Sequence, residues 1–343
     1  MRSLLCVPIA MLLATSTAHA VPDTRTGTEH VALRDVAEQR DATRAVHTAR
    51  PFSVLGLTWD GAAPDDVEVR VRTGERWSAW THLDPADSGR GTEPLWTGRT
   101  DTAEVRARRG AADVTDELRL VAIAPDPSPA PAPREGRGGG PAVVTRAEWG
   151  ADEHLMTWPP QRTTTKAITV HHTAGTNDYA CAQSAELVRG IFQYHAVELK
   201  WGDIGYHALV DKCGTVFEGR AGQPWDAADA GRGDVIGGHV AGFNRNTFGV
   251  AMMGNFDQVA PTPETVRAVA RIAGWKLGQV GVPPDGRTTL TAEGAPRSKF
   301  PAGARVPLPT IFGHRDVSNT ACPGQHGYEQ LDAIRAAARQ PAP

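Results

Sequence analysis

The sequence lacks an excess of positive charge. Its 343 residues include 36 Lys and Arg against 39 Asp and Glu, which gives a formal net charge of −3. Proteins that bind nucleic acid or acidic membrane surfaces usually carry clustered positive charge. The chain has no polybasic run, so we expect no nucleic acid and no membrane among its partners.

Long apolar runs are also missing. A membrane-spanning helix needs about 20 consecutive apolar residues, and the run from Leu4 to Leu13 is far shorter. Arg2 precedes this run and Ala18-His19-Ala20 follows it, which is the pattern of a signal peptide with a small-residue cleavage site. We therefore predict a signal peptide at residues 1–20 and a secreted mature protein.

Cysteine is scarce. Cys6 lies in the predicted signal peptide, so the mature chain keeps Cys181, Cys213 and Cys322. Two of these can form a disulfide, which suits an oxidising compartment. The third needs another role, and this odd count is the first indication of a metal site.

Proline and glycine mark one clear boundary. The stretch 125–141 contains a Pro-rich segment and a Gly triplet, and it cannot bury a core, so we predict a linker there. Residues 21–50 show weak periodicity and many charges, and we expect a lead-in segment that is disordered or forms a short helix. The chain length favours two domains, at residues 51–124 and 142–339.

The first of these domains shows the alternation of β-strands. Val67, Val69 and Val71 alternate with charged residues, and similar runs recur up to residue 123. We predict a small all-β, sandwich-like domain. Four tryptophans lie in it, and they either fill a small core or line a glycan-binding face: Trp59, Trp77, Trp80 and Trp96.

The second domain shows an α/β pattern. An apolar strand ends at His171, and a helix with Ser184 as its N-cap follows. Thr262-Pro263 starts a second helix, and a last helix is expected over about 328–338. We predict an α/β fold with a mixed central β-sheet flanked by helices.

Three residues of this domain form a candidate metal site. His171 ends a strand, and His314 and Cys322 lie eight residues apart near the C-terminus. Two imidazole nitrogens and one thiolate are a common set for Zn²⁺, and three protein ligands leave the fourth position to water. A closed structural zinc site would be expected to use closely spaced pairs of ligands, and the sequence contains no Cys-x-x-Cys or His-x-x-x-His pair. The set favours a catalytic zinc, with Tyr206 and Thr320 as candidate hydroxyl donors to a developing oxyanion.

Several motifs together resemble the peptidoglycan recognition proteins and type 2 N-acetylmuramoyl-L-alanine amidases, a family that includes phage T7 lysozyme. They lie in order over about 143–335: His171-His172-Thr173-Ala174, Trp201-Gly202-Asp203-Ile204-Gly205-Tyr206-His207, Val216-Phe217-Glu218-Gly219-Arg220, Gly238-His239, the segment 248–256, and Gly313-His314-Arg315-Asp316 through Cys322-Pro323-Gly324.

The resemblance implies a zinc amidase that cuts bacterial peptidoglycan between the lactyl group of the glycan and the first residue of the stem peptide. It implies zinc held at His171, His314 and Cys322, and a catalytic Tyr206. The residue matching Thr320 is Lys in some relatives, so its role is less fixed by the family.

By analogy with the family, Arg220, His239 and Asn244 would contact muropeptide, and His195 would pack in the core or border the groove. Many animal relatives bridge two cysteines just after the His-His-Thr motif, whereas this chain has only Cys181 nearby. We therefore pair Cys181 with Cys213.

Two other functions compete with the amidase prediction. Family members without the Cys ligand bind peptidoglycan without cutting it, and a wall peptidase would also hydrolyse an amide. The N-terminal domain would either dock the enzyme on the wall or cover the cleft and restrain activity. No feature of the sequence requires more than a monomer.

Overall fold

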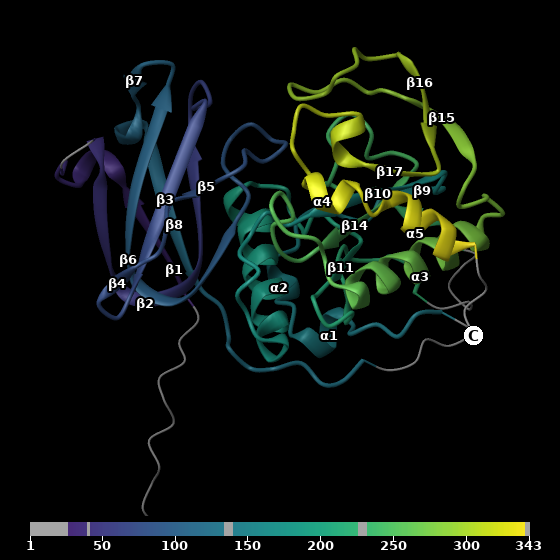
Figure 1. The fold of residues 1–343 in the computed structure, drawn as a ribbon, viewed down its shortest axis with the longest axis horizontal. Helices are drawn as coiled ribbons and strands as arrows, with labels where there is room; N and C mark the ends of the chain where they lie inside the picture. Colours follow the sequence, from purple (N-terminus) through teal and green to yellow (C-terminus); the bar gives the residue numbers. More distant parts are fainter. Residues whose placement is uncertain (1–26, 40–41, 134–139, 226–231, 340–343) are drawn as a thin grey trace, which may run out of the picture.

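The computed structural model describes residues 27–39, 42–133, 140–225 and 232–339. The predicted signal peptide lies outside these ranges. Two domains follow one another along the chain (Figure 1), a β domain and a mixed α/β domain. None of the helices in the described ranges combines the length and apolar character needed to cross a membrane.

The N-terminal domain is one connected antiparallel sheet with the order β1-β8-β2-β6-β3-β4, to which β5 and β7 pair at the side. The sheet encloses a core that includes Leu55, Val69 and Val105. The prediction of a small all-β domain is confirmed. Its strands are β1 (Gly27–Ala32), β2 (Arg44–Trp59), β3 (Asp66–Thr73), β4 (Arg76–Trp77), β5 (Thr81–His82), β6 (Leu95–Arg109), β7 (Ala112–Asp113) and β8 (Leu118–Ala124).

The segment 21–50, expected to be disordered or to form a short helix, instead contributes two stretches of strand to the sheet, although Leu33–Asp35 is a short 3-10 helix. Gly27 to Ala32 pairs with β8 along six residues, and β2 already begins at Arg44. β1 is an edge strand whose side chains are mostly half-buried, so its sequence shows little alternation. Its partner lies almost 100 residues away in the sequence (Gly27 opposite Ala124), and a local pattern cannot reveal such a pairing.

The tryptophans of this domain divide between its interior and its surface, and glycan binding by the exposed pair stays a prediction. Trp59 and Trp96 are buried. Trp77 and Trp80 are partly exposed, and the guanidinium of Arg70 lies 4.9 Å and 4.8 Å from their ring centres.

The C-terminal domain is built on a five-stranded sheet with the order β12-β11-β14-β10-β17. Four of these strands are parallel and β12 is antiparallel, which confirms the predicted mixed sheet. Two further sheets of two strands each, β13-β9 and β15-β16, complete the domain. The strands of the domain are β9 (Arg162–Thr163), β10 (Ala167–His172), β11 (Ala208–Val210), β12 (Val216–Glu218), β13 (Asp234–Val235), β14 (Thr247–Met252), β15 (Arg287–Thr291), β16 (Arg305–Pro309) and β17 (Ile311–Gly313).

Helices cover both faces of the sheet. α3 and α5 pack on the face that includes Val170 and Val250, and α2 packs on the opposite face with Leu209 and Ala251. The helices are α1 (Arg146–Trp149), α2 (Ser184–Gln193), a π-helical turn η7 (Tyr194–Glu198), α3 (Pro263–Gln279), α4 (Gln325–Tyr328) and α5 (Leu331–Ala338).

Of the two predicted helix starts, the one at Thr262 is confirmed and the capping role of Ser184 is wrong. α3 begins as expected, because the Thr262 hydroxyl accepts a hydrogen bond from the backbone N–H of Thr265. Ser184 is instead the first residue of α2 and caps nothing. Its hydroxyl donates to Asp211, 2.7 Å away, and ties the helix to the turn after β11.

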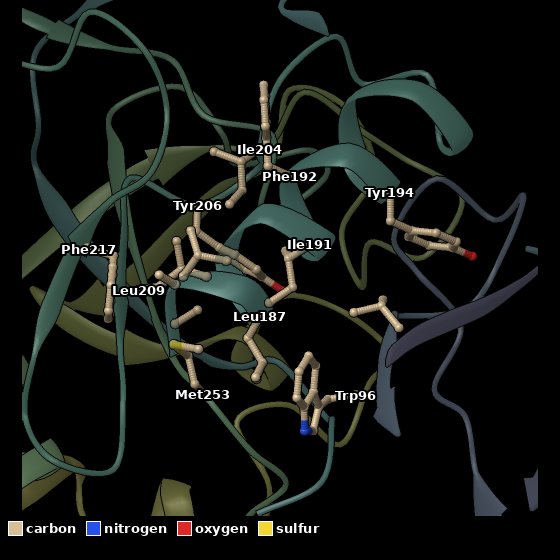
Figure 2. Packing of buried hydrophobic residues seen from close by; sticks show 14 of the residues in the cluster. Trp96, Leu187, Ile191, Phe192, Tyr194, Ile204, Tyr206, Leu209, Phe217 and Met253 are labelled. Carbon is tan, nitrogen blue, oxygen red and sulfur yellow. The ribbon is translucent and has the colours of Figure 1, made fainter. Parts of the chain in front are cut away.

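The two domains share a hydrophobic core. Val54 and Ile123 of the β domain pack in the same cluster as residues of α2, and Trp96 lies there with Leu187 and Ile191 (Figure 2). From Leu120 to Ile123, alternate residues of β8 face the core of the N-terminal domain and the shared core. This part of the strand is therefore buried on both faces. The N-terminal domain is therefore packed firmly against α2.

Candidate functional site

The parallel strands bring His171 and His314 to one end of the sheet. His171 lies near the carboxyl end of β10, and His314 directly follows the last residue of its neighbour β17. Ligand sites of open α/β sheets occur beyond the carboxyl ends of the strands. Strand alternation turns His171 toward the α2 face, because its neighbour Val170 belongs to the opposite core.

Cys322 completes a cluster with these two histidines. Its Sγ lies 3.6 Å from Nδ1 of His171, and one donor atom from each of the three residues lies within 4.8 Å of the others. Zinc bonds of about 2.0–2.1 Å to nitrogen and about 2.3 Å to sulfur place a tetrahedral nitrogen–sulfur pair about 3.5–3.6 Å apart and two nitrogens about 3.3–3.4 Å apart. The donor set and its spacing therefore fit zinc.

The disulfide leaves Cys322 free for this site. Cys181 and Cys213 are bonded to each other as predicted, and Cys322 is a buried free thiol. Burial raises the pKa of the Cys322 thiol well above its ordinary value, and the carboxylates of Glu93, Asp84 and Asp87 add to the effect. Metal binding requires the thiolate, so a cation between the three ligands would supply the stabilisation that this buried sulfur lacks.

Two neighbours hold the ligands in place. Nδ1 of His239 lies 2.9 Å from Nε2 of His171, which leaves Nδ1 of His171 facing Cys322. The Thr320 hydroxyl accepts a hydrogen bond from the backbone N–H of Cys322 at 3.1 Å. Partners of this kind fix the orientation of metal ligands. His239, expected to contact substrate, thus lies behind a ligand.

Four histidines around the site, His171, His172, His207 and His239, have a lowered pKa and are neutral at neutral pH. Burial first, and repulsion from neighbouring histidines second, hold the pKa of His171 and of His239 well below the ordinary value. Burial lowers the pKa of His172 to about 3 and that of His207 to about 4. Neutral imidazole is the form that binds metal. His172 and His207 themselves bond to backbone groups, at Phe256 and Val235 respectively.

Tyr206 lies beside the cluster, with its ring centre 5.3 Å from that of His171. It follows the loop 201–205, which is fixed by the buried ion pair of Asp203 with Arg146 and by a hydrogen bond from Gly205 N–H to His195. Burial, followed by the charge of Glu93, raises the pKa of Tyr206 well above its ordinary value. The phenol therefore stays protonated and able to donate.

Of the remaining predicted substrate contacts, Arg220 and His195 are buried and Asn244 is half-buried, and all three bond to the protein. Arg220 is 2% exposed, donates to the carbonyl of Ile204 and stacks on Trp158. The amide oxygen of Asn244 accepts from the backbone N–H groups of His239 and Val240. His195 is fully buried against Trp201. In this structure these side chains support the walls of the site.

The sequence did not indicate a loop of the N-terminal domain that enters the site. Residues 83–94, called the cleft loop here, connect β5 to β6 and carry Asp84, Asp87 and Glu93. Asp87 lies 3.0 Å from Nε2 of His314, and Glu93 lies 3.5 Å from the Tyr206 hydroxyl. Turn-forming residues and three acids are common in any surface loop, so nothing local assigns this segment to a site in another domain.

Comparisons with known proteins agree with this description. Residues 161–325 match the family N-acetylmuramoyl-L-alanine amidase, and residues 14–135 match the family described as Rv3811 N-terminal galactose-binding domain-like. Through residues 161–325 the chain belongs to the type 2 N-acetylmuramoyl-L-alanine amidase family, which includes the peptidoglycan recognition proteins.

Relatives of the chain include animal proteins. Peptidoglycan-recognition protein SC1a of Drosophila melanogaster is 28% identical over 189 residues, which cover 55% of this chain and 83% of that protein. The human N-acetylmuramoyl-L-alanine amidase is 30% identical over 198 residues, which cover 56% of this chain but 28% of the human enzyme.

Solved structures that resemble the chain include Drosophila peptidoglycan recognition protein SD, with 24% identity and a TM-score of 0.41 over 55% of this chain and 92% of that one. Another is the N-acetylmuramoyl-L-alanine amidase LysC from Clostridium intestinale, with 22% identity and a TM-score of 0.38 over 56% of this chain and 96% of that one.

Proposed function

We propose that this chain is a secreted, zinc-dependent N-acetylmuramoyl-L-alanine amidase. It would hydrolyse the amide between the lactyl group of N-acetylmuramic acid and the L-alanine of the stem peptide in peptidoglycan. The observation that carries the proposal is the cluster of His171, His314 and Cys322 beside the protonated hydroxyl of Tyr206. The disulfide supports export, because such bonds persist in oxidising compartments.

Zinc held by these three residues would polarise the scissile carbonyl and lower the pKa of a bound water to about 7. The protein supplies the rest. His239 holds the ring of His171, and Thr320 holds the backbone that presents Cys322. The Tyr206 hydroxyl is the donor for the carbonyl oxygen on which negative charge develops during attack.

A recognition protein that binds without cutting is the alternative within the family. Such members lack the Cys ligand, whereas Cys322 is present here and lies within the donor cluster. This favours catalysis over binding alone. We propose that the protein acts as a monomer on peptidoglycan outside the cell.

Zinc content and turnover test the proposal together. Wild type, Cys322→Ser and His314→Ala would be compared with His326→Ala, which removes a partly exposed histidine on α4. Wild type and His326→Ala should bind zinc in equimolar amount and release stem peptides from purified walls during long incubation. The two ligand variants should lose both properties. Retention of zinc and turnover by Cys322→Ser would contradict the ligand set, and zinc binding without any release would favour a recognition protein.

A further inference from the structure

The cleft loop places three carboxylates against the candidate active site. Asp87 contacts His314 at 3.0 Å and accepts a second hydrogen bond from the backbone N–H of Ala241. Glu93 lies 3.5 Å from the Tyr206 hydroxyl and 3.6 Å from Nε2 of His195. Asp84 lies 3.9 Å from Nε2 of His172. Every one of these partners belongs to the other domain.

Little space remains between the loop and the site. The cavity bounded by Asp87, Glu93, Tyr206, His314 and Cys322 has a volume of about 20 Å³. About 10–15 Å³ of such volume holds one water molecule, whereas pockets that take small organic ligands measure about 300–1,000 Å³. A sugar joined to a peptide cannot enter while the loop is in place.

Hydrogen bonds within the cleft loop and to β2 hold the loop in one conformation. Ala86 N–H donates to the carbonyl of Gly91, and Glu93 N–H donates to that of Asp84, so the loop closes on itself. Thr92 accepts from the backbone N–H of Leu57 at 3.1 Å and anchors the loop to β2. A loop held at this many points keeps its shape when it leaves or enters a cleft.

Glycines make the docking of the two domains unusually close. A Cβ atom on Gly56 would lie 2.3 Å from the ring of Tyr194, and one on Gly190 would lie 2.5 Å from Val54. On Gly91, in the cleft loop, a Cβ would lie 2.9 Å from Leu199. The Tyr194 hydroxyl donates to the Leu57 carbonyl at 3.0 Å, and the Ser53 hydroxyl donates to Glu186 at 2.7 Å. A larger residue at Gly56 would force the domains apart, because the three atoms nearest to its Cβ all belong to Tyr194, whereas at Gly91 the Leu57 carbonyl of the same domain is 2.8 Å away.

From these observations we propose that the cleft loop is an autoinhibitory plug. The structure is then the latent form, in which the N-terminal domain closes the active site, and the domain must move away from α2 before peptidoglycan can bind. The regulation rests on the proposed amidase function. The physical closure of the cleft does not, since it would hold for a binding protein too.

A wedge at the docking surface tests the plug without touching any polar group of the site. Gly56→Val introduces a side chain that only the docked state excludes, because its nearest neighbours belong to Tyr194. Gly61→Val is the matched control, since a Cβ there meets no atom within 4 Å. A second variant, Asp87→Ala with Glu93→Ala, removes the two carboxylates, and Glu75→Ala serves as its exposed control.

Two measurements separate the plug from the amidase proposal. The first is the rate at which a thiol reagent alkylates Cys322 in zinc-free protein, read by peptide mapping. The second is the release of stem peptides by the zinc-loaded protein. A shift of about 1.4 kcal/mol toward the open state multiplies a small open fraction tenfold. We therefore expect both rates to rise on the order of tenfold in Gly56→Val and in the double variant, but not in the controls.

Each outcome is decisive. Faster alkylation without any peptide release would support the plug and contradict the amidase. Unchanged alkylation in a folded Gly56→Val protein that still releases peptides would overturn the plug and leave the amidase intact. If Gly56→Val does not fold by circular dichroism, the double variant decides by the same readings. A loss of release in the double variant, with zinc retained, would also overturn the plug and make the two carboxylates supports of catalysis.

Discussion

The carboxylate of Asp87 lies 3.0 Å from Nε2 of His314, although 227 residues separate the two in the sequence. Burial would raise the pKa of Asp87, but the imidazole of His314 and the N–H of Ala241 lower it below its ordinary value. The ionised carboxylate thus joins a loop of the β domain to a predicted metal ligand of the α/β domain. The two domains therefore contact each other at the candidate site.

Tyr206→Phe tests the role of the phenol. The substitution removes the proposed donor to the oxyanion and keeps the ring, so we expect the rate of amide hydrolysis to fall by about 100- to 1000-fold with zinc content unchanged. Tyr179→Phe is the control, because it also removes a buried hydroxyl, one that donates to Met253. Equal losses in both variants would show that only stability had been measured.

His239→Ala tests the support of His171. Loss of the imidazole that lies 2.9 Å from Nε2 of His171 frees the ligand to rotate. We expect zinc affinity to fall by about 10- to 100-fold, the usual effect of removing such a partner. Competition with a fluorescent chelator would measure this change. If affinity stays at the wild-type value while binding of muropeptide weakens, His239 contacts substrate as first predicted.

The disulfide is expected to stabilise the fold. Its cysteines are 32 residues apart, and closing a loop of that size reduces the entropy of the unfolded chain by an amount worth roughly 3–4 kcal/mol. Denaturant unfolding of Cys181→Ala with Cys213→Ala should show a loss of that order. A double variant as stable as wild type would mean that the bond does not form in the exported protein.

Asp234 and Lys276 form a buried ion pair away from the metal cluster, at 2.7 Å. Burial alone would raise the pKa of Asp234, but the ammonium of Lys276 and further hydrogen bonds lower it from 3.8 to about 2. A depressed pKa stabilises the fold above pH 3.8, and this contribution is lost as the pH falls toward 2.

Asp234→Asn should therefore destabilise the protein at neutral pH by about 3–5 kcal/mol, because Lys276 is left buried without its partner. Urea unfolding at several pH values would show the difference from wild type shrinking in acid. A difference that does not depend on pH would mean that the ion pair contributes nothing through its charge.

The sequence predicted best where local pattern and chemistry coincide. Alternating valines indicated the β domain, Thr262-Pro263 marked the start of α3, and the unpaired Cys322 suggested a metal ligand. Each of these signals depends on residues close together in the chain or on a simple count.

Long-range features escaped prediction for a physical reason. β1 is defined by its pairing with β8, which leaves no local period. A cleft covered by the N-terminal domain was one of two predicted alternatives, but the residues that reach the site, such as Asp87 at His314, could not be identified from the sequence. His239 and Arg220 were assigned to substrate because polar residues in family motifs suggest contact. Both side chains are buried here and bond to other residues of the site, and their contact with substrate stays a prediction.

Mass spectrometry of the reaction products identifies which amide bond the protein cuts. Zinc-loaded Gly56→Val and the same protein with Cys322→Ser would be incubated with purified peptidoglycan. We expect intact glycan strands and stem peptides with a free N-terminal alanine, released only when Cys322 is present. Fragments cut within the stem or crosslink, or no fragments from a protein that binds both zinc and walls, would contradict it.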